Sequence, residues 1–257
     1  MDGFTELEGG NWIFVSHSNT DIVEVRGIRD FFESRGHNPI LFYLRSLNDD
    51  DHLPELLERE INARNFFVLC DSPNSRRSKW VQEEIRMVKL RPEKVYEEVD
   101  LTRDLESQLH KLEALAKRAT VFLSYSSRDR QIGTRISTSL RDADFRLLEF
   151  EPSLFEPQMP RLIKEAMNHG FVLLLVTKQW TTSQFASVEY TQALEEALAL
   201  EEQTVPQINN LVPVLIEDVG VVPVAFWRLL TPIDFRGEDF EWQMRKLILE
   251  LKTRRMD

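Results

Sequence analysis

Short apolar runs alternate along the chain with longer stretches in which apolar residues recur every three or four positions. The run 13–15 is followed by such a stretch over residues 22–32, and Gly36 then marks the end of the predicted helix. The other predicted strands are 40–42, 66–70, 99–101, 121–124, 147–149, 171–176, 211–216 and 232–235. The other predicted helices are 53–63, 78–90, 102–116, 131–143, 160–168, 183–200 and 240–251. Strands that alternate with helices indicate βαβ units, and therefore parallel sheets with helices on both faces.

The chain also repeats itself. Residues 13–21 (IFVSHSNTD) return as residues 121–129 (VFLSYSSRD), and residues 65–69 return at nearly the same separation as residues 170–174. Single positions keep this separation as well: Ser78 matches Ser183, Trp80 matches Phe185 and Glu84 matches Glu189. A repeat this long indicates a duplicated domain, because the units of solenoid proteins are much shorter.

The two copies predict an α/β protein of two flavodoxin-like domains, residues 1–117 and residues 118–257. Residues 99–101 precede a helix and match residues 233–235, which also precede a helix, but at a larger separation. The first copy therefore lacks one strand–helix segment and has no counterpart of residues 211–216. No Gly/Ser/Pro-rich linker joins the copies, so we expect the two domains to pack against each other.

Composition excludes several classes of protein. The net charge of −11 argues against a nucleic-acid-binding surface, which needs clustered positive charge. No apolar run is long enough for a membrane helix and the first residues are acidic, so we expect a cytoplasmic protein without membrane contact. The single cysteine, Cys70, lies in an apolar run and predicts a buried thiol, and the histidines show no metal-ligand spacing, so no metal site is expected.

The candidate chemistry lies where the first and third strands of each repeat end. Ligands of open parallel sheets bind beyond the carboxyl ends of the strands, at the point where the strand order reverses. In the first repeat, residues 16–21 and 71–84 leave the sheet at this point. Trp80 and Glu84 are four residues apart on a predicted helix and therefore share one face. An aromatic ring beside a carboxylate suits a ligand that combines a flat heteroaromatic with a sugar.

These segments resemble Toll/interleukin-1 receptor (TIR) domains of the bacterial type. Residues 13–18 and 121–126 resemble the opening strand of that family. Residues 72–84 (SPNSRRSKWVQEE) resemble the segment that contains the catalytic glutamate of its NAD-cleaving members. Residues 177–189 are a weaker match, because Phe185 stands where the family usually has tryptophan. The resemblance covers nearly the whole chain.

The resemblance implies a set of site residues. Glu84 and Glu189 would be the catalytic carboxylates of the two repeats. The remaining substrate-binding residues would be Ser16, His17 and Trp80 in the first repeat and Ser124, Tyr125 and Phe185 in the second. NAD would be a consumed substrate, with no bound cofactor, and one carboxylate would stabilise the oxocarbenium-like state formed when nicotinamide leaves. Trp80 suits a core anchor as well as a pocket wall, and Glu84 alone could be an ordinary helix glutamate.

Two functions follow from the resemblance. In the first, the protein is an NAD glycohydrolase or ADP-ribosyl cyclase of innate immunity or anti-phage (antiviral) defence, with linear or cyclic ADP-ribose as product. In the second, it is a non-catalytic adaptor that binds other TIR domains in signal transduction. The loss of tryptophan at position 185 and the missing segment of the first copy favour the adaptor. Either function implies contacts with other TIR domains and with a separate sensor or effector protein.

Overall fold

The structure is a computed structural model that describes residues 4–41, 53–150, 159–182, 210–220, 232–237 and 239–254. The chain forms two compact units. The first-repeat unit comprises Gly10–Ala119 and Ala143–Arg146. The second-repeat unit comprises Met1–Gly9, Thr120–Asp142 and Leu147–Asp257. The helix predicted over residues 183–200 lies outside the described residues.

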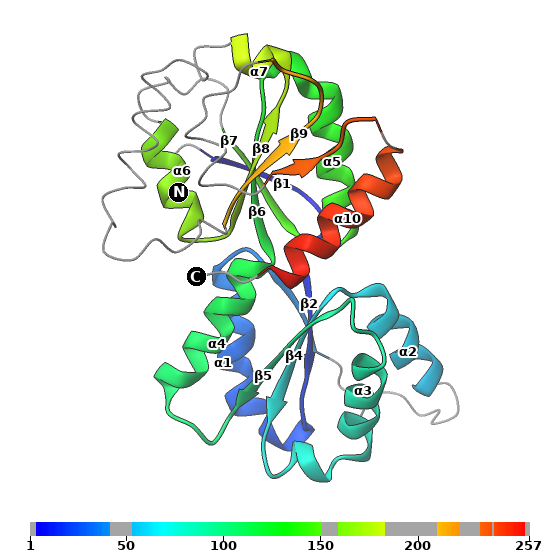
Figure 1. The fold of residues 1–257 in the computed structure, drawn as a ribbon. Coiled ribbons are helices and arrows are strands. Elements are labelled where there is room, and N and C mark those ends of the chain that lie inside the picture. The colour runs from blue at the N-terminus through cyan, green and yellow to red at the C-terminus, as the bar shows by residue number, and fades with distance from the viewer. Residues whose placement is uncertain are drawn as a thin grey trace. The chain divides into compact units, whose positions relative to one another are not determined.

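The first-repeat unit is built on a parallel sheet with the strand order β3-β2-β4-β5 (Figure 1). The strands are β2 (Trp12–Ser16), β3 (Asn38–Leu41), β4 (Phe66–Asp71) and β5 (Val95–Asp100). Every residue of β4 is buried, as is every residue of β2 after Trp12. Continuous buried runs are typical of central parallel strands that helices cover on both faces.

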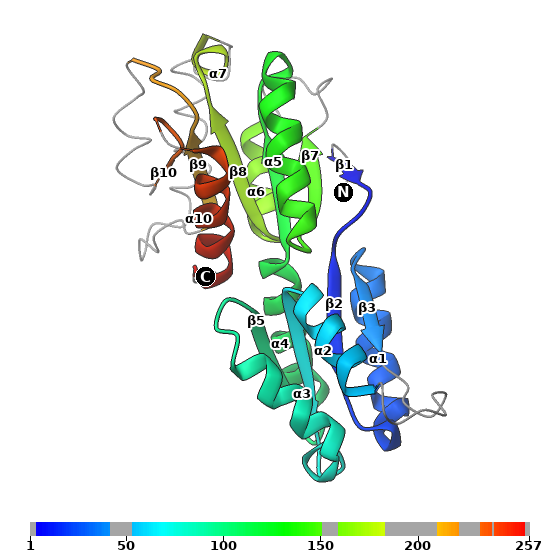
Figure 2. The same cartoon turned by 90° about the vertical axis from the view of Figure 1, so that its right-hand side faces the viewer.

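Four helices cover this sheet, two on each face (Figures 1 and 2). The helices are α1 (Ile22–Ser34), α2 (Leu53–Ala63), α3 (Lys79–Lys89) and α4 (Leu105–Arg118). Helix α1 packs beside α4, and α2 packs beside α3. Gly36 follows α1 with a φ of 75°, a left-handed conformation that glycine adopts without a steric penalty.

Between the sheet and the α2–α3 face lies an apolar core. Phe14 of β2 stacks on Phe67 of β4 with ring centroids 5.2 Å apart, and Phe67 stacks in turn on Tyr96 of β5 at 5.7 Å. Leu57 and Ile61 of α2 are buried against the same cluster. The apolar spacing in residues 53–63 thus predicted the correct helix and the correct buried face.

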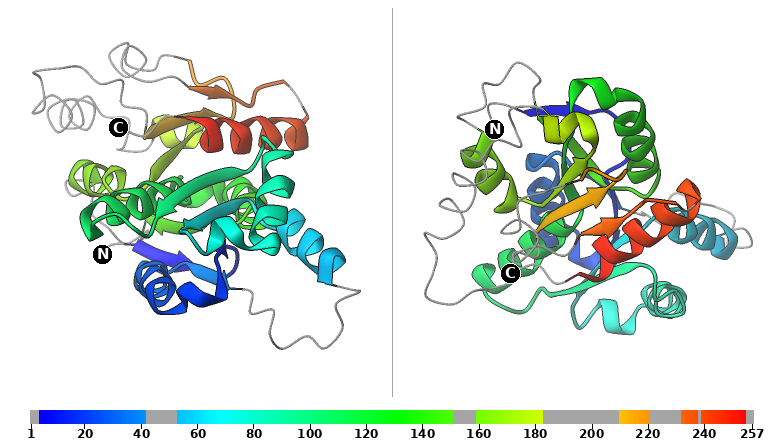
Figure 3. Two further views of the ribbon diagram at one scale, coloured as in Figure 1. Left: turned by 90° about the horizontal axis from the view of Figure 1, so that it is seen from below. Right: turned by 45° about the horizontal axis from the view of Figure 1, so that its top comes forward.

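The second-repeat unit contains a larger sheet with the order β1-β7-β6-β8-β9-β10. The strands are β1 (Phe4–Leu7), β6 (Thr120–Ser124), β7 (Arg146–Phe150), β8 (Phe171–Val176), β9 (Leu211–Leu215) and β10 (Ile233–Asp234). The described helices are α5 (Arg130–Asp142), α6 (Met159–Met167), α7 (Lys178–Thr182) and α10 (Phe240–Thr253). Helices α5 and α10 lie on one side of the strands and α6 on the other (Figures 1 and 3).

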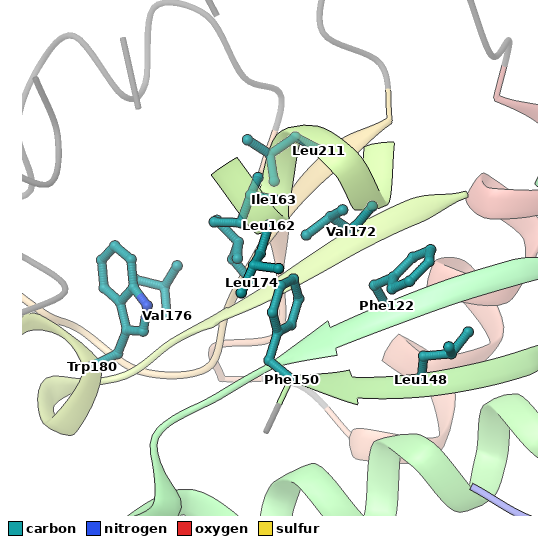
Figure 4. Close-up of a cluster of buried hydrophobic side chains, with 11 residues drawn as sticks. Phe122, Leu148, Phe150, Leu162, Ile163, Val172, Leu174, Val176, Trp180 and Leu211 are labelled. Carbon is teal, nitrogen blue, oxygen red and sulfur yellow. The ribbon is translucent and has the colours of Figure 1, made fainter. Parts of the chain in front are cut away.

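Helix α6 covers a second apolar core. Leu162 and Ile163 of α6 pack against Phe122 of β6 and Val172 of β8 (Figure 4). Trp180 of the short helix α7 is buried in the same cluster. This core is the counterpart of the cluster under α2 and α3, which agrees with the duplication seen in the sequence.

Among the described strands, the first repeat lacks a counterpart of the outermost strand of the second. The first-repeat sheet has four described strands, and β5 pairs with β4 as β9 pairs with β8. In sheet position β5 is therefore the counterpart of β9, and no described strand of the first repeat corresponds to β10. Among the described residues the first repeat has one strand fewer, as predicted, but two expectations are wrong: residues 211–216 do have a counterpart, and residues 99–101 do not match residues 233–235. That match rested on an apolar–Asp–apolar triplet before a helix, a pattern that can follow any strand of such a fold.

Each compact unit also contains a short segment from outside its own repeat. Strand β1, which the sequence groups with residues 1–117, pairs antiparallel with β7. Phe4 of β1 lies with its ring centroid 5.0 Å from that of Phe122 and 4.9 Å from that of Phe150. Conversely, Ala143–Arg146 belongs to the first-repeat unit, where Phe145 is fully buried and its ring is nearly perpendicular to that of Phe66.

Asp144 anchors this second segment, and we expect Asp144→Ala to destabilise the protein by about 2 kcal/mol. Its carboxylate accepts hydrogen bonds from the backbone N–H of Asn65 at 2.8 Å and from Nδ2 of Asn65 at 3.3 Å, and it is 3% exposed. Its φ of 63° is a conformation that Asp tolerates better than Ala. Urea unfolding followed by circular dichroism measures the loss. Asp142→Ala is the matched control because Asp142 is exposed, and an equal loss in both variants would contradict the anchoring role.

Candidate functional site

The switch point of the first-repeat sheet lies between β2 and β4. These strands are direct neighbours, and α1 after β2 and α3 after β4 lie on opposite faces. Ser16 is the last residue of β2, and Asp71 is the last residue of β4. The segments that leave these two strand ends are residues 16–21 and 71–84, where the sequence predicted the candidate chemistry.

Glu84 lies at this point with its side chain turned into the protein. It is 4% exposed, and its Oε2 accepts a hydrogen bond from the Ser16 hydroxyl. Helix α3 places it there because Val81, Glu84 and Val88 all lie on the buried stripe of the helix. Ser78 begins the helix by accepting the Val81 N–H with its hydroxyl. The structure thus joins Ser16 and Glu84, which are 68 residues apart in the chain.

Burial makes Glu84 an unusual carboxyl group. Removal from water raises its pKa to about 7, although the hydrogen bond from Ser16 opposes this rise. The neighbouring Glu83 has the opposite environment, because the Arg86 guanidinium that donates to it lowers its pKa. Two adjacent glutamates therefore differ because only one of them lies on the buried face of α3.

Trp80 and His17 take more ordinary positions. Trp80 is half-buried one turn before Glu84 and packs against the apolar core beneath α2 and α3. Trp80 therefore makes the contacts expected of a residue that anchors α3 to the core. His17 is buried with Nδ1 3.0 Å from the carbonyl oxygen of Val15, and burial lowers its pKa. The imidazole is accordingly neutral at physiological pH.

The sequence did not indicate a second polar bridge across the switch point. The carboxylate of Asp21 accepts hydrogen bonds from the Ser72 hydroxyl at 2.5 Å and from Nδ2 of Asn74 at 2.6 Å. Asp71 and Arg76 form an ion pair in the same connection between β4 and α3. Residues 18–21 and 72–78 are rich in Ser, Asn and Asp, but such a composition does not say which side chains will pair.

The second-repeat unit shows only part of its predicted site. Ser124 is buried at the end of β6, and the next residue, Tyr125, donates from its hydroxyl to Oε1 of Glu149 at 3.0 Å. Burial, and then the charge of Glu149, raises the pKa of Tyr125 to about 12. A Cβ on Gly133 of α5 would lie only 2.7 Å from Cζ of Tyr125, so the ring rests directly on this glycine. Glu189 and Phe185 lie outside the described residues.

The second repeat does reproduce the Asp21 bridge. Oδ2 of Asp129, the counterpart of Asp21, accepts a hydrogen bond from the Thr177 hydroxyl at 2.6 Å. The Thr177 oxygen in turn accepts the Trp180 N–H at 2.9 Å, as the Ser72 oxygen accepts the Ser75 N–H at 2.9 Å. The two copies therefore share the local geometry of this connection.

Two further kinds of site were sought in the part of the chain that the structure describes. Its histidines, cysteine and acidic residues form no group of three that could hold a metal ion. None of its helices has the length and apolar character needed to cross a membrane.

One comparison with known proteins, the family model, agrees with the duplicated architecture. The family model for the TIR domain matches the chain twice, over residues 13–103 and residues 121–248. A solved structure of a metazoan TIR-STING receptor from C. gigas, in complex with 2',3'-cGAMP, is 22% identical with a TM-score of 0.36. That match covers 52% of this chain and 39% of the receptor chain, so the chain spans well under half of the receptor's length. No curated protein sequence matched the chain.

The two family matches together span most of the chain and coincide with the two copies found in the sequence. Domains of this family serve in signalling or defence and typically interact with other TIR domains. The chain belongs to the TIR-domain family and carries two TIR domains in tandem.

Proposed function

We propose that the first TIR domain cleaves NAD at the bond between nicotinamide and ribose, with Glu84 as the working carboxylate. The C1′–N bond breaks and its electron pair leaves with nicotinamide, which becomes neutral. The ribose is left with oxocarbenium character, and water then bonds to C1′ and releases a proton. Capture by a nitrogen of the adenine ring instead of water would give a cyclic product. The reaction needs no metal and no redox partner.

The observation that carries this proposal is the buried Glu84 carboxyl group with its Ser16 donor at the switch point of the sheet. An anion removed from water interacts more strongly with a developing positive charge than a solvated anion does. A carboxylate also accepts hydrogen bonds from ribose hydroxyls, as Glu84 accepts one from the Ser16 hydroxyl. The family resemblance of residues 72–84 points to the same residue.

Glu84 is enclosed in this structure, so cleavage requires that its carboxyl group first becomes accessible. At 4% exposure, the carboxylate meets a substrate only after its side chain or its cover shifts. We therefore expect little turnover by the dilute chain and more when copies assemble, since TIR domains interact with one another. Such cleavage would lower NAD or release an ADP-ribose signal in a cytoplasmic defence or signalling system, with a separate sensor or effector protein.

A second candidate function is a non-catalytic adaptor that binds other TIR domains. It is favoured by the packing of Trp80 against the apolar core and by the enclosed position of Glu84, both of which an interior residue would show. An adaptor needs no ionised Glu84 and consumes no NAD. Cleavage of NAD therefore distinguishes the two candidates.

The test is nicotinamide release from NAD by the purified full chain, followed by chromatography at low and high protein concentration and with a crowding agent. We expect release that increases with concentration and survives Glu189→Ala, because the first repeat has the more complete motif. Release that is lost in Glu189→Ala would move the activity to the second repeat. Absence of nicotinamide under every assembling condition would favour the adaptor.

A further inference from the structure

Two polar bridges cross the switch point of the first-repeat unit. One joins Ser16 to Glu84, and the other joins Asp21 to Ser72 and Asn74. Both bridges join residues 16–21, at the end of β2 and the start of α1, to residues 72–84, which follow β4 and lead into α3. The first contains the proposed working carboxylate, whereas the proposed chemistry leaves the second without a role.

Asp21 stands at the start of a helix but does not act as a capping residue. It occupies the N-cap position of α1, and its side chain makes no capping hydrogen bond. Asp at this position usually accepts a backbone N–H of the first helical turn. Here both carboxylate oxygens face the neighbouring connection instead, and Asp21 is 6% exposed. A buried carboxylate with two donors makes strong, charge-assisted hydrogen bonds.

A continuous set of hydrogen bonds leads from this carboxylate to α3. The Ser72 oxygen, which donates to Asp21, accepts the N–H groups of Asn74 at 3.1 Å and Ser75 at 2.9 Å. The Ser75 hydroxyl accepts the Ser72 N–H at 2.8 Å. The Ser78 N–H reaches the carbonyl oxygens of Asn74 and Ser75, both at 3.1 Å, and Ser78 caps α3. The first turn of α3 is thereby tied to Asp21.

We propose that Asp21 is a positioning residue, which fixes the start of α3 through Ser72 so that Glu84 stays enclosed against the Ser16 hydroxyl. The consequence of Asp21 for catalysis rests on the proposed function, but the effect of Asp21 on the Glu84 carboxyl group does not. Asp21 touches neither Glu84 nor the reacting atoms. It acts through the connection, and its loss lets α3 and Glu84 move toward water.

The second repeat supplies matched variants for the test. Thr177 has the role of Ser72, so the same bridge forms with a threonine hydroxyl and Ser72→Thr should preserve it. Ser72→Ala removes the hydroxyl without changing any charge. Asp129→Asn alters the equivalent bridge of the other unit and leaves the first-repeat unit intact.

The experiment measures the titration of the Glu84 carboxyl carbon by NMR in the full chain labelled with 13C-glutamate, with Glu84→Gln to assign the signal. In the unaltered protein we expect a midpoint near 7, set by burial. Asp21→Asn and Ser72→Ala should lower it by about one pH unit or more, toward the value of a hydrated carboxyl group. Ser72→Thr and Asp129→Asn should leave it unchanged. Circular dichroism confirms that each variant is folded.

Nicotinamide release by the same variants is the second measurement. Asp21→Asn and Ser72→Ala should lower kcat and shift the acid limb of the pH profile together with the NMR midpoint. If the Glu84 midpoint shifts in Asp21→Asn but not in Ser72→Ala, the lost charge of Asp21 alone explains the shift, and the proposal is overturned. An equal shift in Asp129→Asn would overturn it as well. If the unaltered protein releases no nicotinamide but the midpoints move as expected, the proposed function fails and the positioning role stands.

Discussion

Replacement of Glu84 by alanine is expected to lower nicotinamide release at least about 100-fold, whereas Glu83→Ala should leave it nearly unchanged. A group that stabilises charge in the transition state contributes about 10²–10³ in rate when it acts inside a protein. Glu84 is buried beside Ser16, while Glu83 is partly exposed and paired with Arg86. The two variants remove the same side chain from adjacent positions of one helix.

The comparison separates chemistry from helix stability. Both variants are assayed under the assembling condition that gives the highest release, and kcat and KM are determined separately. Loss of an interaction made only in the transition state lowers kcat and kcat/KM together. An equal, small loss in both variants would contradict the assignment of Glu84, because a general effect on α3 would then explain it.

Much of the arrangement of helices and strands was accessible from the sequence because most of the described elements follow one hydrophobic period. Residues 53–63 show apolar residues three and four apart, and α2 has these bounds. The run 171–176 is apolar throughout, and it forms the fully buried strand β8. Long-range pairing was less accessible. Strand β1 was not predicted because four residues of mixed polarity carry no clear period, and pairing with β7 is decided by tertiary contacts.

The candidate site was predicted in part for a similar reason. Glu84 lies three residues after Val81 and four before Val88, so the helical period already placed a carboxylate on the apolar stripe of α3. Ser16 could be predicted as a site residue because it is the polar residue at the end of the apolar run 13–15. The bridge between Asp21 and Ser72 could not be read in this way, because the two residues are 51 positions apart. Only the paired recurrence of Asp129 and Thr177 could have suggested it.

Glu84→Gln is expected to stabilise the protein at pH 8 by about 2–3 kcal/mol more than at pH 5. The ordinary carboxyl pKa of 4.5 applies to the unfolded chain, and burial raises the pKa of Glu84 to about 7 in the folded protein. A carboxyl group with a raised pKa supports folding most below pH 4.5, and this support is lost as the pH rises through 7. Each pH unit of difference corresponds to about 1.4 kcal/mol. Glutamine has a similar shape, keeps an acceptor for Ser16 and carries no charge to bury.

Urea unfolding of the full chain and of Glu84→Gln at both pH values measures this difference, with Glu83→Gln as the control. Glu83 lies where water reaches it and its pKa is lowered by Arg86, so its replacement should bring no gain at high pH. The same effect of Glu84→Gln at pH 5 and pH 8 would mean that Glu84 ionises as readily in the folded protein as in water. A gain confined to high pH would show that the fold bears a cost for an ionised group at the switch point of its sheet. Such a cost is expected of a group that serves function at the expense of stability, and the adaptor has no use for it.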